Sequence, residues 1–452
     1  MPISGFPEWL PSQRMIEQYV LDRIRSTFEL YGFAPLETRS VEPLETLLSK
    51  GETSKEVYLL RRLQEDESSV RSGAVAGRSD GESSGKSEDQ LGLHFDLTVP
   101  FARYVVENAG KLHFPFRRYQ IQKVWRGERP QEGRYREFLQ ADIDVVNRDT
   151  LPFHFDTEMP LVIGDALGGL PIPPARIQVN NRKVCEGFYR GLGLTDTDQV
   201  LRTVDKLDKI GPARVAEQLV ETAGATRAQA DACLELAAIS AEDASFTDAV
   251  RKLGVTHPLL DEGLDELVQV VETAREHAPG LVTAELKIAR GLDYYTGTVY
   301  ETQLRGYERF GSICSGGRYD NLASAGSQRF PGVGISIGVS RMLGLLFGHN
   351  ALTASRSVPT CVLVALPTDD QRPACDQIAG ALRRRGIPTE VAPTAAKFGK
   401  QIRYADQRGI PYVWFPGDPD TVKDIRSGDQ PEADPTTWTP PATDLHPTIT
   451  AS

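Results

Sequence analysis

Several features that would place a chain in a special class are missing from this sequence. No apolar run approaches the roughly 18 residues that a membrane-spanning helix needs, so we expect no association with a membrane. The opening residues, MPISGFPEWLPSQR, have neither the basic nor the apolar block of a secretory signal. The five cysteines form no CxxC pair and one is left over, which argues against a disulfide framework or a zinc knuckle. Together these absences predict a cytoplasmic protein.

Familiar catalytic signatures are also absent, apart from one short match to a hydrolase motif. The chain has no GxxxxGK[ST] phosphate loop, no HExxH zinc helix, no kinase motifs and no other protein metal motif. Residues 334–338 fit the GxSxG elbow of serine hydrolases, with Ser336 as the nucleophile. Such a triad needs a later histidine, and His349 is too close in sequence while His446 lies in the polar tail. A serine hydrolase is therefore an alternative, and a buried glycine-rich strand is the favoured interpretation.

Length and charge limit the remaining possibilities. At roughly 150 residues per domain, 452 residues suggest about three domains with ample material for a core. The 51 Lys and Arg against 62 Asp and Glu argue against indiscriminate nucleic-acid binding but permit local basic surfaces. Residues 111–137 carry eight basic and three acidic side chains, and residues 383–408 carry seven and two. Each of these two basic segments is either a binding surface or simply a solvated face.

The N-terminal third of the chain combines a clear helix with an unusual insert. Ile16, Val20, Ile24 and Phe28 recur every four residues, which predicts a helix with one face packed on a sheet. Residues 65–91 are rich in Ser, Gly and charge and have almost no large apolar groups, so we expect a disordered hairpin insert. The flanking segments KEVYLLRRL and LGLHFDLTVPFARY are interpreted as the two arms of that hairpin.

Residues 116–146 contain the most informative pattern, two predicted strands around the loop GERPQEGRY. By the two-residue period of a strand, one face of the second arm is apolar. That apolar face consists of Leu139, Ala141, Ile143 and Val145. The polar side chains that share the other face are Gln140, Asp142 and Asp144, with Arg118, Gln120, Gln122 and Arg126 on the first arm. If the arms pair, these groups line one surface of a sheet, unless that surface is only a solvated face.

The rest of the chain divides into several parts. Residues 175–280 have helical spacing and predict a helical insertion. The segments ELKIARGLDYYTGTVYETQL, GSICSGGRYDNL and GVGISIGVSRMLGL then look like strands of one sheet, the last running into a helix near Ser340. Residues 357–430 show a βαβαβ pattern typical of a separate α/β domain, and residues 431–452 predict a flexible tail.

Three arginines point toward a nucleotide. Arg126, Arg290 and Arg341 stand beside glycines or at a helix start, on segments that the strand pattern brings to one sheet. A guanidinium group suits phosphate because its planar fork donates two hydrogen bonds and its charge is permanent. One such arginine alone is more often a surface ion-pair residue. Three on one glycine-lined sheet favour a nucleotide site.

Long segments of the chain resemble the histidyl-tRNA synthetase family of class II aminoacyl-tRNA synthetases. WRGERPQEGRYREFLQADIDVV resembles the second class II motif, VEPLE the first motif at the dimer interface, and CSGGRYDNL with GVGISIGVSRM the third motif region. RGLDYYTGTVYE resembles the histidine-specific signature, while GFPEWLP and KFGKQIRYADQRGIPYVWF extend the match to nearly the whole chain. The resemblance implies an α+β fold: an antiparallel-sheet catalytic domain in residues 1–350 with a helical insertion, and an α/β anticodon-binding domain in residues 357–430.

The resemblance also implies an activity and an ATP site. The enzyme would activate L-histidine with ATP to histidyl-adenylate, release pyrophosphate and transfer histidine to the 3′ end of its tRNA. ATP would come with Mg²⁺, and the enzyme would be a homodimer. Arg126 would lie on the α-phosphate, Arg341 toward the γ-phosphate and Glu128 in the same ATP site. Arg126 and Arg290 would be catalytic, with Arg290 stabilising the charge that develops at the carboxylate and the α-phosphate.

The histidine pocket follows from the same resemblance. An imidazole offers one N–H donor and one acceptor, and a pocket that pairs both rejects other side chains. The residues implied for the substrate amino group are Asp96, Thr98 and Gln140. Those implied for the rest of histidine are Asp144, Arg290, Tyr294, Tyr295 and Tyr319, with Asp144 and Tyr295 on the imidazole. Without the resemblance, the tyrosines read as core packing and the aspartates as turn or strand-edge carboxylates.

The two basic segments acquire separate roles in tRNA binding. The residues implied at the acceptor end are Arg129, Gln131, Arg134 and Arg136. Those implied as phosphate contacts in the anticodon-binding domain are Lys397, Lys400 and Arg403, which would position RNA without reading its bases. Two departures from the family pattern are the 65–91 insert and a short stretch after Gly417, which puts the last strand pairing of that domain in doubt. Asp96-Leu97-Thr98 follows an Asp-Leu variant of the family's Glu-Gly-Thr.

Two further alternatives share the fold. One is a non-catalytic paralogue that binds histidine and regulates a phosphoribosyltransferase, but such paralogues usually lack the anticodon domain and erode the histidine signature. The other is an RNA-binding protein with an inactive site, which the retained arginines disfavour.

Overall fold

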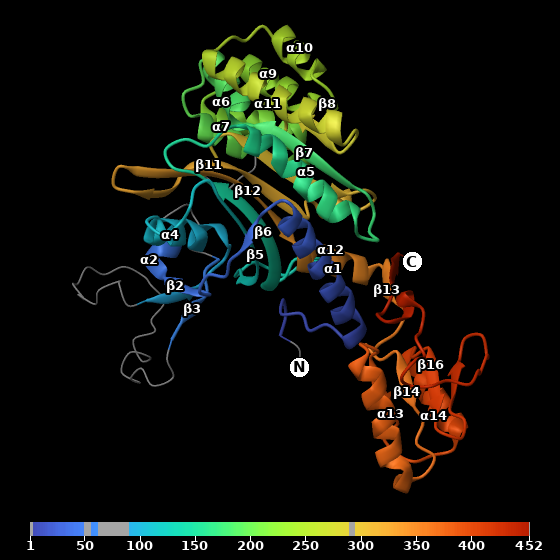
Figure 1. Ribbon diagram of the computed structural model, residues 1–452. Coiled ribbons are helices and arrows are strands. Elements are labelled where there is room, and N and C mark those ends of the chain that lie inside the picture. The colour runs from blue at the N-terminus through green and yellow to red at the C-terminus, as the bar shows by residue number, and fades with distance from the viewer. Residues whose placement is uncertain (1–2, 49–55, 62–89, 289–293, 452) are drawn as a thin grey trace, which may run out of the picture. The chain divides into compact units, whose positions relative to one another are not determined.

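The computed structural model describes residues 3–48, 56–61, 90–288 and 294–451 (Figure 1). The chain divides into two units. Unit 1 comprises Met1–Pro7 with Arg23–Leu345, and unit 2 comprises Glu8–Asp22 with Leu346–Ser452. None of the helices in the described ranges combines the length and the hydropathy of a membrane span.

The predicted N-terminal helix is present as α1 (Pro11–Leu30), which contributes residues to both units. Its four-residue apolar stripe is buried throughout, as the spacing predicts. Phe28 contacts the ring of Tyr119 in the main sheet, with ring centroids 6.0 Å apart, so the expected packing on a sheet is confirmed there. Gly32 follows the helix with φ +77°, a backbone conformation that glycine adopts without strain.

Unit 1 is built on a nine-stranded sheet in the order β1-β5-β6-β12-β11-β10-β7-β9-β8. Neighbouring strands are antiparallel except in the pairs β1–β5 and β7–β9. The antiparallel catalytic-domain sheet expected from the sequence is therefore present. The strands are β1 (Ala34–Pro35), β5 (Phe116–Trp125), β6 (Glu137–Val146), β7 (Ala175–Asn181), β8 (Ser240–Ala241), β9 (Val282–Glu285), β10 (Thr298–Leu304), β11 (Cys314–Ala325) and β12 (Gln328–Gly338).

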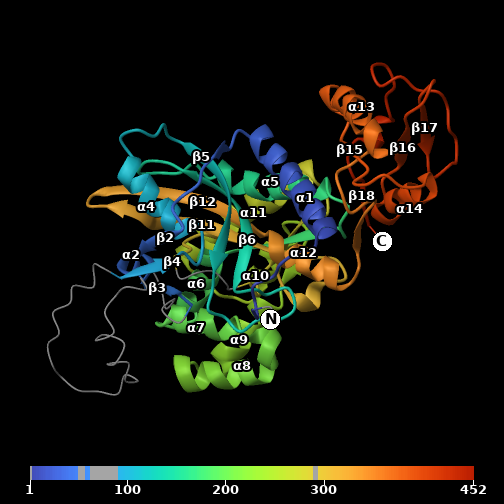
Figure 2. The ribbon, with the colours of Figure 1, turned by 90° about the horizontal axis from the view of Figure 1, so that it is seen from below.

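The helices of unit 1 cover this sheet. α5 (His154–Gly168) packs against β7 and β12 (Figure 2), and α4 (Thr98–Asn108) packs against β11. The helical segment gathers beside β7 (Figure 1). Its helices are α6 (Arg182–Gly191), α7 (Thr197–Val204), α8 (Leu207–Ala223), α9 (Arg227–Ala237), α10 (Ser245–Lys252) and α11 (Pro258–His277). This segment therefore starts at Arg182, because residues 175–181, which the sequence placed in it, form strand β7 of the sheet.

The segments around the predicted insert are only partly as expected. A small sheet joins β2 (Val41–Pro43), β4 (Leu91–Leu93) and β3 (Leu59–Leu60), so β3 and β4 do pair as hairpin arms. The continuation VPFARY is helical within α4 and not part of an arm, because its apolar side chains bury one face at helical spacing. The short α2 (Leu44–Leu48) follows β2. The insert itself lies outside the described residues, apart from residues 90 and 91.

The glycine-rich segments after the helical part form strands of one sheet, as predicted. β10, β11 and β12 lie consecutively in the sheet, and β12 leads directly into α12 (Val339–Gly348) at the predicted position. Between β10 and β11 the chain makes the short turn η2 (Glu308–Phe310).

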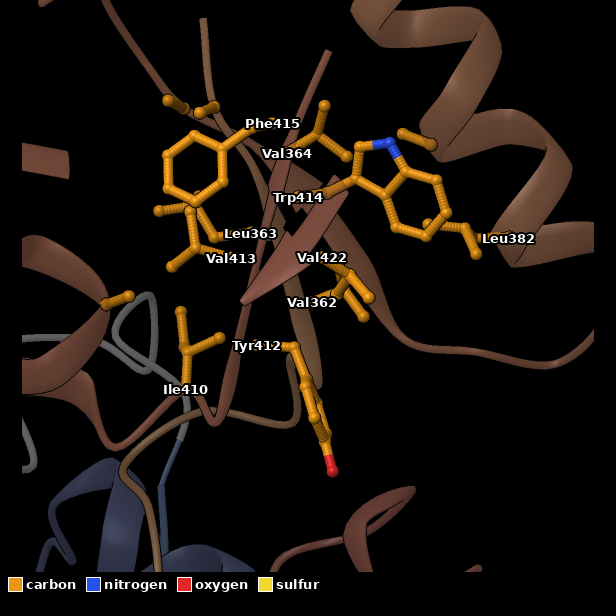
Figure 3. Close-up of a cluster of buried hydrophobic side chains, with 14 of the residues drawn as sticks. Val362, Leu363, Val364, Leu382, Ile410, Tyr412, Val413, Trp414, Phe415 and Val422 are labelled. Carbon is orange, nitrogen blue, oxygen red and sulfur yellow. The ribbon is translucent and has the colours of Figure 1, made fainter. Parts of the chain in front are cut away.

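Unit 2 contains the predicted α/β module. Its sheet has the order β15-β14-β16-β17, and the buried Trp414 lies beside Leu382 in a core shown in Figure 3. The elements are β14 (Val362–Val364), η3 (Asp369–Gln371), α13 (Arg372–Arg384), β15 (Thr389–Val391), α14 (Phe398–Arg408), β16 (Tyr412–Phe415) and β17 (Thr421–Asp424). β17 pairs antiparallel with β16, so the short stretch after Gly417 still allows the last strand to form.

The expectation of a flexible tail in residues 431–452 is wrong for the described residues, which extend to residue 451. β18 (Ile449–Ala451) pairs with β13 (Leu352–Ala354), and η4 (Ala442–Asp444) precedes it. Trp438 packs edge-on against Trp414 with ring centroids 5.7 Å apart, and Arg385 donates hydrogen bonds to the carbonyls of Pro435 and Thr437. The polar composition of this segment did not reveal the packing of Trp438 or the backbone carbonyls that accept hydrogen bonds from Arg385.

Candidate functional site

A cavity of about 180 Å³ opens on unit 1 where β6, β11 and β12 lie side by side. Its walls include Arg126 and Glu128 from the loop after β5, Gln140 from β6, Ser336 from β12 and Arg341 from α12. Sheet pairing therefore brings together three residues assigned to ATP with one assigned to the substrate amino group.

The polar face of β5 and β6 is buried, so the alternative of a solvated face is wrong. The two strands pair in the register Gln122↔Gln140, Gln120↔Asp142 and Arg118↔Asp144. Arg118 and Gln120 are completely buried, and Asp142 and Asp144 are only 2% and 3% exposed. Buried polar groups persist only where they are paired or await a ligand. This face is therefore a built polar site.

Asp144 is the centre of the deepest part of this site. Its carboxylate forms an ion pair with Arg118, whose Nη2 lies 2.6 Å from Oδ2, and accepts a hydrogen bond from the Tyr319 hydroxyl at 2.7 Å. Burial raises the pKa of Asp144, and the charge of Arg118 opposes that effect. A side chain at Gly334 would place its Cβ 2.2 Å from Asp144 Oδ1, so glycine is needed there to leave room for the carboxylate. The arrangement suits recognition of a ligand N–H group.

Asp96 lies just before α4 and is also buried. Its Oδ1 accepts the backbone N–H of Val99 at 3.1 Å, which caps the start of the helix. Among the residues that the structure describes, no donor reaches its Oδ2. Burial raises the pKa of Asp96 to about 6, opposed in part by the charge of Arg126. The unpaired oxygen makes Asp96 chemically suitable for a cationic ligand group.

The predicted aromatic residues form one cluster beside these carboxylates. Tyr294 packs edge-on against Tyr295 and Tyr319, with ring centroids 4.9 Å and 6.2 Å away. Thr98 hydrogen-bonds to Tyr294, so its side chain supports this wall. Burial is the main cause that raises the pKa of Tyr295, and the charge of Asp144 adds to the increase. The Tyr295 hydroxyl therefore stays neutral and can donate a hydrogen bond. These tyrosines therefore pack in the protein core and also form a wall beside the buried carboxylates.

Two of the three predicted arginines face the cavity. Arg126 Nε donates to the carbonyl of Phe95 at 2.9 Å, and its Nη1 lies 3.7 Å from Glu128 Oε1. Arg341 Nη2 donates to the carbonyl of Phe310. Both guanidinium groups are thus oriented by backbone acceptors while lining the cavity. The third, Arg290, lies outside the described residues.

The residues assigned to the tRNA acceptor end differ in their surroundings. Arg129 and Gln131 are exposed, and Arg134 lies 3.5 Å from Glu128 Oε2 at the cavity wall. Arg136 is half-buried and donates to the carbonyl of Glu128 at 3.0 Å, so it also shapes the loop. In unit 2, the side chains assigned to phosphate contacts are all exposed, one just before α14 and two within it. These are Lys397, Lys400 and Arg403.

Three residues in the site were not among those assigned from the sequence. Arg118 and Asp142 had appeared only in the two-residue alternation. Cross-strand pairing could have placed Arg118 opposite Asp144, and the alternation itself puts Asp142 on the same face of β6. Ser336 had appeared only as a candidate hydrolase nucleophile. It lies inside β12 and not on a strand-to-helix turn, so the elbow interpretation is wrong. Among the described ranges no group of three or more possible metal-binding side chains occurs.

Comparisons with known proteins agree with this geometry. A family model described as "Histidyl-tRNA synthetase" matches residues 83–342, and one described as "Anticodon binding domain" matches residues 360–430. The chain is 59% identical to the "Histidine--tRNA ligase" of Micrococcus luteus, covering 99% of this chain and 98% of that protein. It is 57% identical to the same enzyme of Cutibacterium acnes, with coverages of 99% and 98%. The crystal structure of histidyl-tRNA synthetase from Nostoc sp. PCC 7120 matches with a TM-score of 0.82 and 33% identity over 96% of each chain. The chain belongs to the histidyl-tRNA synthetase family.

Proposed function

We propose that this ligase joins histidine to the 3′ end of its tRNA through a histidyl-adenylate made from ATP. The observation that carries the proposal is that arginines held by backbone acceptors and buried carboxylates lie in one site. Arg126 and Arg341 line the cavity, and Gln140 connects it along β6 with Asp142 and Asp144. Guanidinium groups suit a triphosphate, and buried carboxylates suit the cationic part of an amino acid.

The first step needs no protein nucleophile. An oxygen of the histidine carboxylate attacks the α-phosphorus of ATP, the bond to the β-phosphate oxygen breaks, and pyrophosphate leaves. Negative charge builds up on the α-phosphate oxygens during this attack. A fixed cation there lowers the barrier, because it is oriented before the reaction begins. We assign Arg126 to the α-phosphate, Arg290 to the carboxylate and α-phosphate, and Arg341 to the γ-phosphate.

The second step uses the same site. A hydroxyl of the terminal tRNA ribose loses its proton as its oxygen attacks the carbonyl carbon of histidyl-adenylate, and AMP leaves with the electrons of the broken C–O bond. The exposed Arg129 and Gln131, with Arg134 at the cavity wall, would hold the acceptor end. Arg136 would act mainly by fixing the loop through Glu128.

Histidine recognition divides between two groups of residues. We assign Asp144 and Tyr295 to the imidazole, since an ionised carboxylate accepts and a neutral phenol can donate. The walls around the ring are Tyr294 and Tyr319. Asp96 and Gln140 would accept from the α-ammonium group, while Thr98 supports them through its hydrogen bond to Tyr294.

ATP would bring Mg²⁺, which neutralises phosphate charge. Magnesium is usually held by one or two carboxylates together with substrate phosphates and water. Glu128 fits that role, since it lies at the cavity wall and its ion pairs are long, 3.7 Å to Arg126 and 3.5 Å to Arg134.

The remaining assignments concern the whole protein. We infer a catalytic core in residues 1–350 and an anticodon-binding domain in residues 357–430, with Lys397, Lys400 and Arg403 contacting phosphates. We infer a homodimer because the exposed leucines Leu59, Leu60 and Leu91 gather on the small sheet that begins with the first motif. The five cysteines are free, in keeping with a reducing cytoplasm.

ATP–pyrophosphate exchange by the purified chain tests the proposal. Exchange should depend on histidine, and exchange without that dependence would remove the assignment. Arg290→Ala should reduce the exchange rate by orders of magnitude while sparing the fold, because it removes charge stabilisation in the transition state. A variant with the full wild-type rate would contradict the role of Arg290.

A further inference from the structure

Ser336 is an exception on strand β12, because the other positions from 332 to 338 on its face are glycines. Along β12, residues 332, 334, 336 and 338 share one face by the two-residue period, and three of the four are glycine. A Cβ at Gly332 would lie 2.5 Å from the Tyr319 ring, and one at Gly334 would lie 2.2 Å from Asp144 Oδ1. The strand thus lacks side chains where pocket groups need room. Ser336 is the one position on this face from 332 to 338 where a side chain remains.

Ser336 connects two residues of the neighbouring strand. It lies directly opposite Asp142 in the register of β12 and β6. Gln140 Nε2 donates to Ser336 Oγ at 2.7 Å, and the Ser336 hydroxyl, directly across from Asp142, lowers the pKa of that carboxyl as a hydrogen-bond donor does. The three side chains therefore lie in a row along the sheet face, with Ser336 between Gln140 and Asp142, and two of them, Gln140 and Ser336, line the cavity.

The chemistry of Asp142 fixes the direction of the hydrogen bonds in this row. In its ionised form the Asp142 carboxylate only accepts hydrogen bonds, so the single hydroxyl proton of Ser336 then points to Asp142. Ser336 can then only accept from its other neighbour, which must present an N–H group. The amide nitrogen of Gln140 is accordingly turned to Ser336, and the amide oxygen is turned away. Among the described residues, no donor pairs with Gln140 Oε1.

We propose that Asp142 and Ser336 are positioning residues that set the orientation of the Gln140 amide, so that the site selects substrates with a protonated α-amino group. The proposal rests on the function proposed above and adds residues to its selectivity. Gln140 Oε1 and Asp96 Oδ2 are both buried acceptors without a donor among the described residues. An α-ammonium group carries three N–H donors and no acceptor, so it satisfies both, while a hydrogen or a carboxylate in its place satisfies neither.

The electrostatics around Asp142 also favour a cation. The charged groups that act on Asp142 are the guanidinium of Arg118 and the carboxylates of Asp144 and Asp96. Burial raises the pKa of Asp142 to about 7, and a hydrogen bond from Ser336 opposes that increase. A positive ligand group near this cluster would stabilise all three carboxylates in their ionised form.

The test compares two inhibitors of ATP–pyrophosphate exchange by the full chain. Histamine keeps the imidazole and the ammonium group, whereas 3-(imidazol-4-yl)propionate keeps the ring and the carboxylate but has no amino group. Ser336→Ala frees the Gln140 amide to turn. We expect the inhibition constant of histamine to rise about five- to tenfold, the worth of one buried hydrogen bond, while that of the propionate stays unchanged. The KM for histidine should rise likewise, with kcat and the KM for ATP nearly constant.

A second variant and a control complete the test. Asp142→Asn keeps the side-chain volume but can donate a hydrogen bond to Ser336, so that Ser336 can in turn donate to Gln140. This variant should therefore show the same selective weakening of histamine binding, and it tests the proposal even if Ser336→Ala does not fold. Thr283→Val removes a buried hydroxyl of the same sheet that accepts from Arg176 at 2.9 Å, and should leave both inhibition constants unchanged. Equal weakening of both inhibitors, or no change in either, would overturn the proposal. Loss of histidine dependence in the wild-type protein would instead refute the proposed function.

Discussion

Replacing Asp144 by asparagine should damage histidine recognition far more than it damages the fold. The substitution keeps the size of the side chain and removes its charge. It leaves Arg118, which is completely buried, without its ionic partner at 2.6 Å. It also replaces a group that only accepts hydrogen bonds with one that both donates and accepts, which weakens its match to an imidazole N–H.

The size of the effect follows from the burial of the pair. Hydrogen bonds to charged groups contribute about 1.5–3 kcal/mol, and Asp144 is only 3% exposed, so solvent does not screen its charge. The upper half of that range corresponds to a loss of about 50- to 150-fold in kcat/KM for histidine. The KM for ATP should remain near the wild-type value, because Asp144 is not among the side chains at the cavity wall beside Arg126 and Arg341.

Asp156→Asn is a matched control. Asp156 is also a fully buried aspartate, which accepts from Arg318 Nη1 and from Thr298 Oγ1, both at 2.8 Å. Both variants should lose stability in urea unfolding, since one leaves the buried Arg118 and the other the mostly buried Arg318 with a weaker partner. Histidine-dependent exchange should fall steeply for Asp144→Asn alone.

A KM for histidine in Asp144→Asn close to that of the wild-type protein would refute the reasoning. Equal losses of exchange in both variants would also count against it, because they would assign the effect to the fold and not to the ligand. Urea unfolding of both proteins separates these outcomes from simple loss of folded material.

Three further results are expected. Burial raises the pKa of Asp96 to about 6 and of Asp142 to about 7, above the value near 3.9 of an unfolded chain. The folded protein then holds protons that the unfolded chain has lost, so stability should fall as the pH rises from about 4 to about 7, and Asp142→Asn should flatten that fall in urea unfolding. Gly334→Ala places a Cβ 2.2 Å from Asp144 Oδ1 and should raise the KM for histidine more than tenfold, which corresponds to a loss of about 1.4 kcal/mol or more in binding free energy. Gly110→Ala, whose Cβ would have no atom within 4 Å, should leave that KM unchanged. Lys400→Ala should reduce the slope of log K against log salt in tRNA binding by about 0.7–0.9 and leave ATP–pyrophosphate exchange unchanged, which filter binding at several salt concentrations would measure.

Much of the sheet could be predicted because its signals are local. The alternation from Leu139 to Val145 correctly separated a buried apolar face from a polar one, and the apolar stripe of α1 correctly predicted its buried face. The prediction failed where a local signal has two interpretations. VPFARY is apolar enough for a strand but forms helix α4, and the polar composition of residues 431–452 did not reveal the packing of Trp438.

The candidate site was predictable only in part, for the same reason. The resemblance assigned Asp96, Gln140 and Asp144 to histidine, and all three are buried polar residues of unit 1. Neither the resemblance nor the alternation of polar and apolar residues assigned a role to Arg118 or Asp142. Whether a polar strand face is solvated or buried depends on what covers it. That covering comes from distant segments, as in the bond from Tyr319 to Asp144 across 175 positions.

The sequence by itself determined the strand and helix periods, the positions of the glycines and the family to which the chain belongs. Only the tertiary structure decided that Ser336 touches Gln140, 196 positions earlier in the chain, and that three aspartates share a region with one guanidinium group. The physical reason is that backbone preferences act over a few residues, whereas burial, pKa and hydrogen-bond direction depend on neighbours that only the folded sheet brings within contact distance.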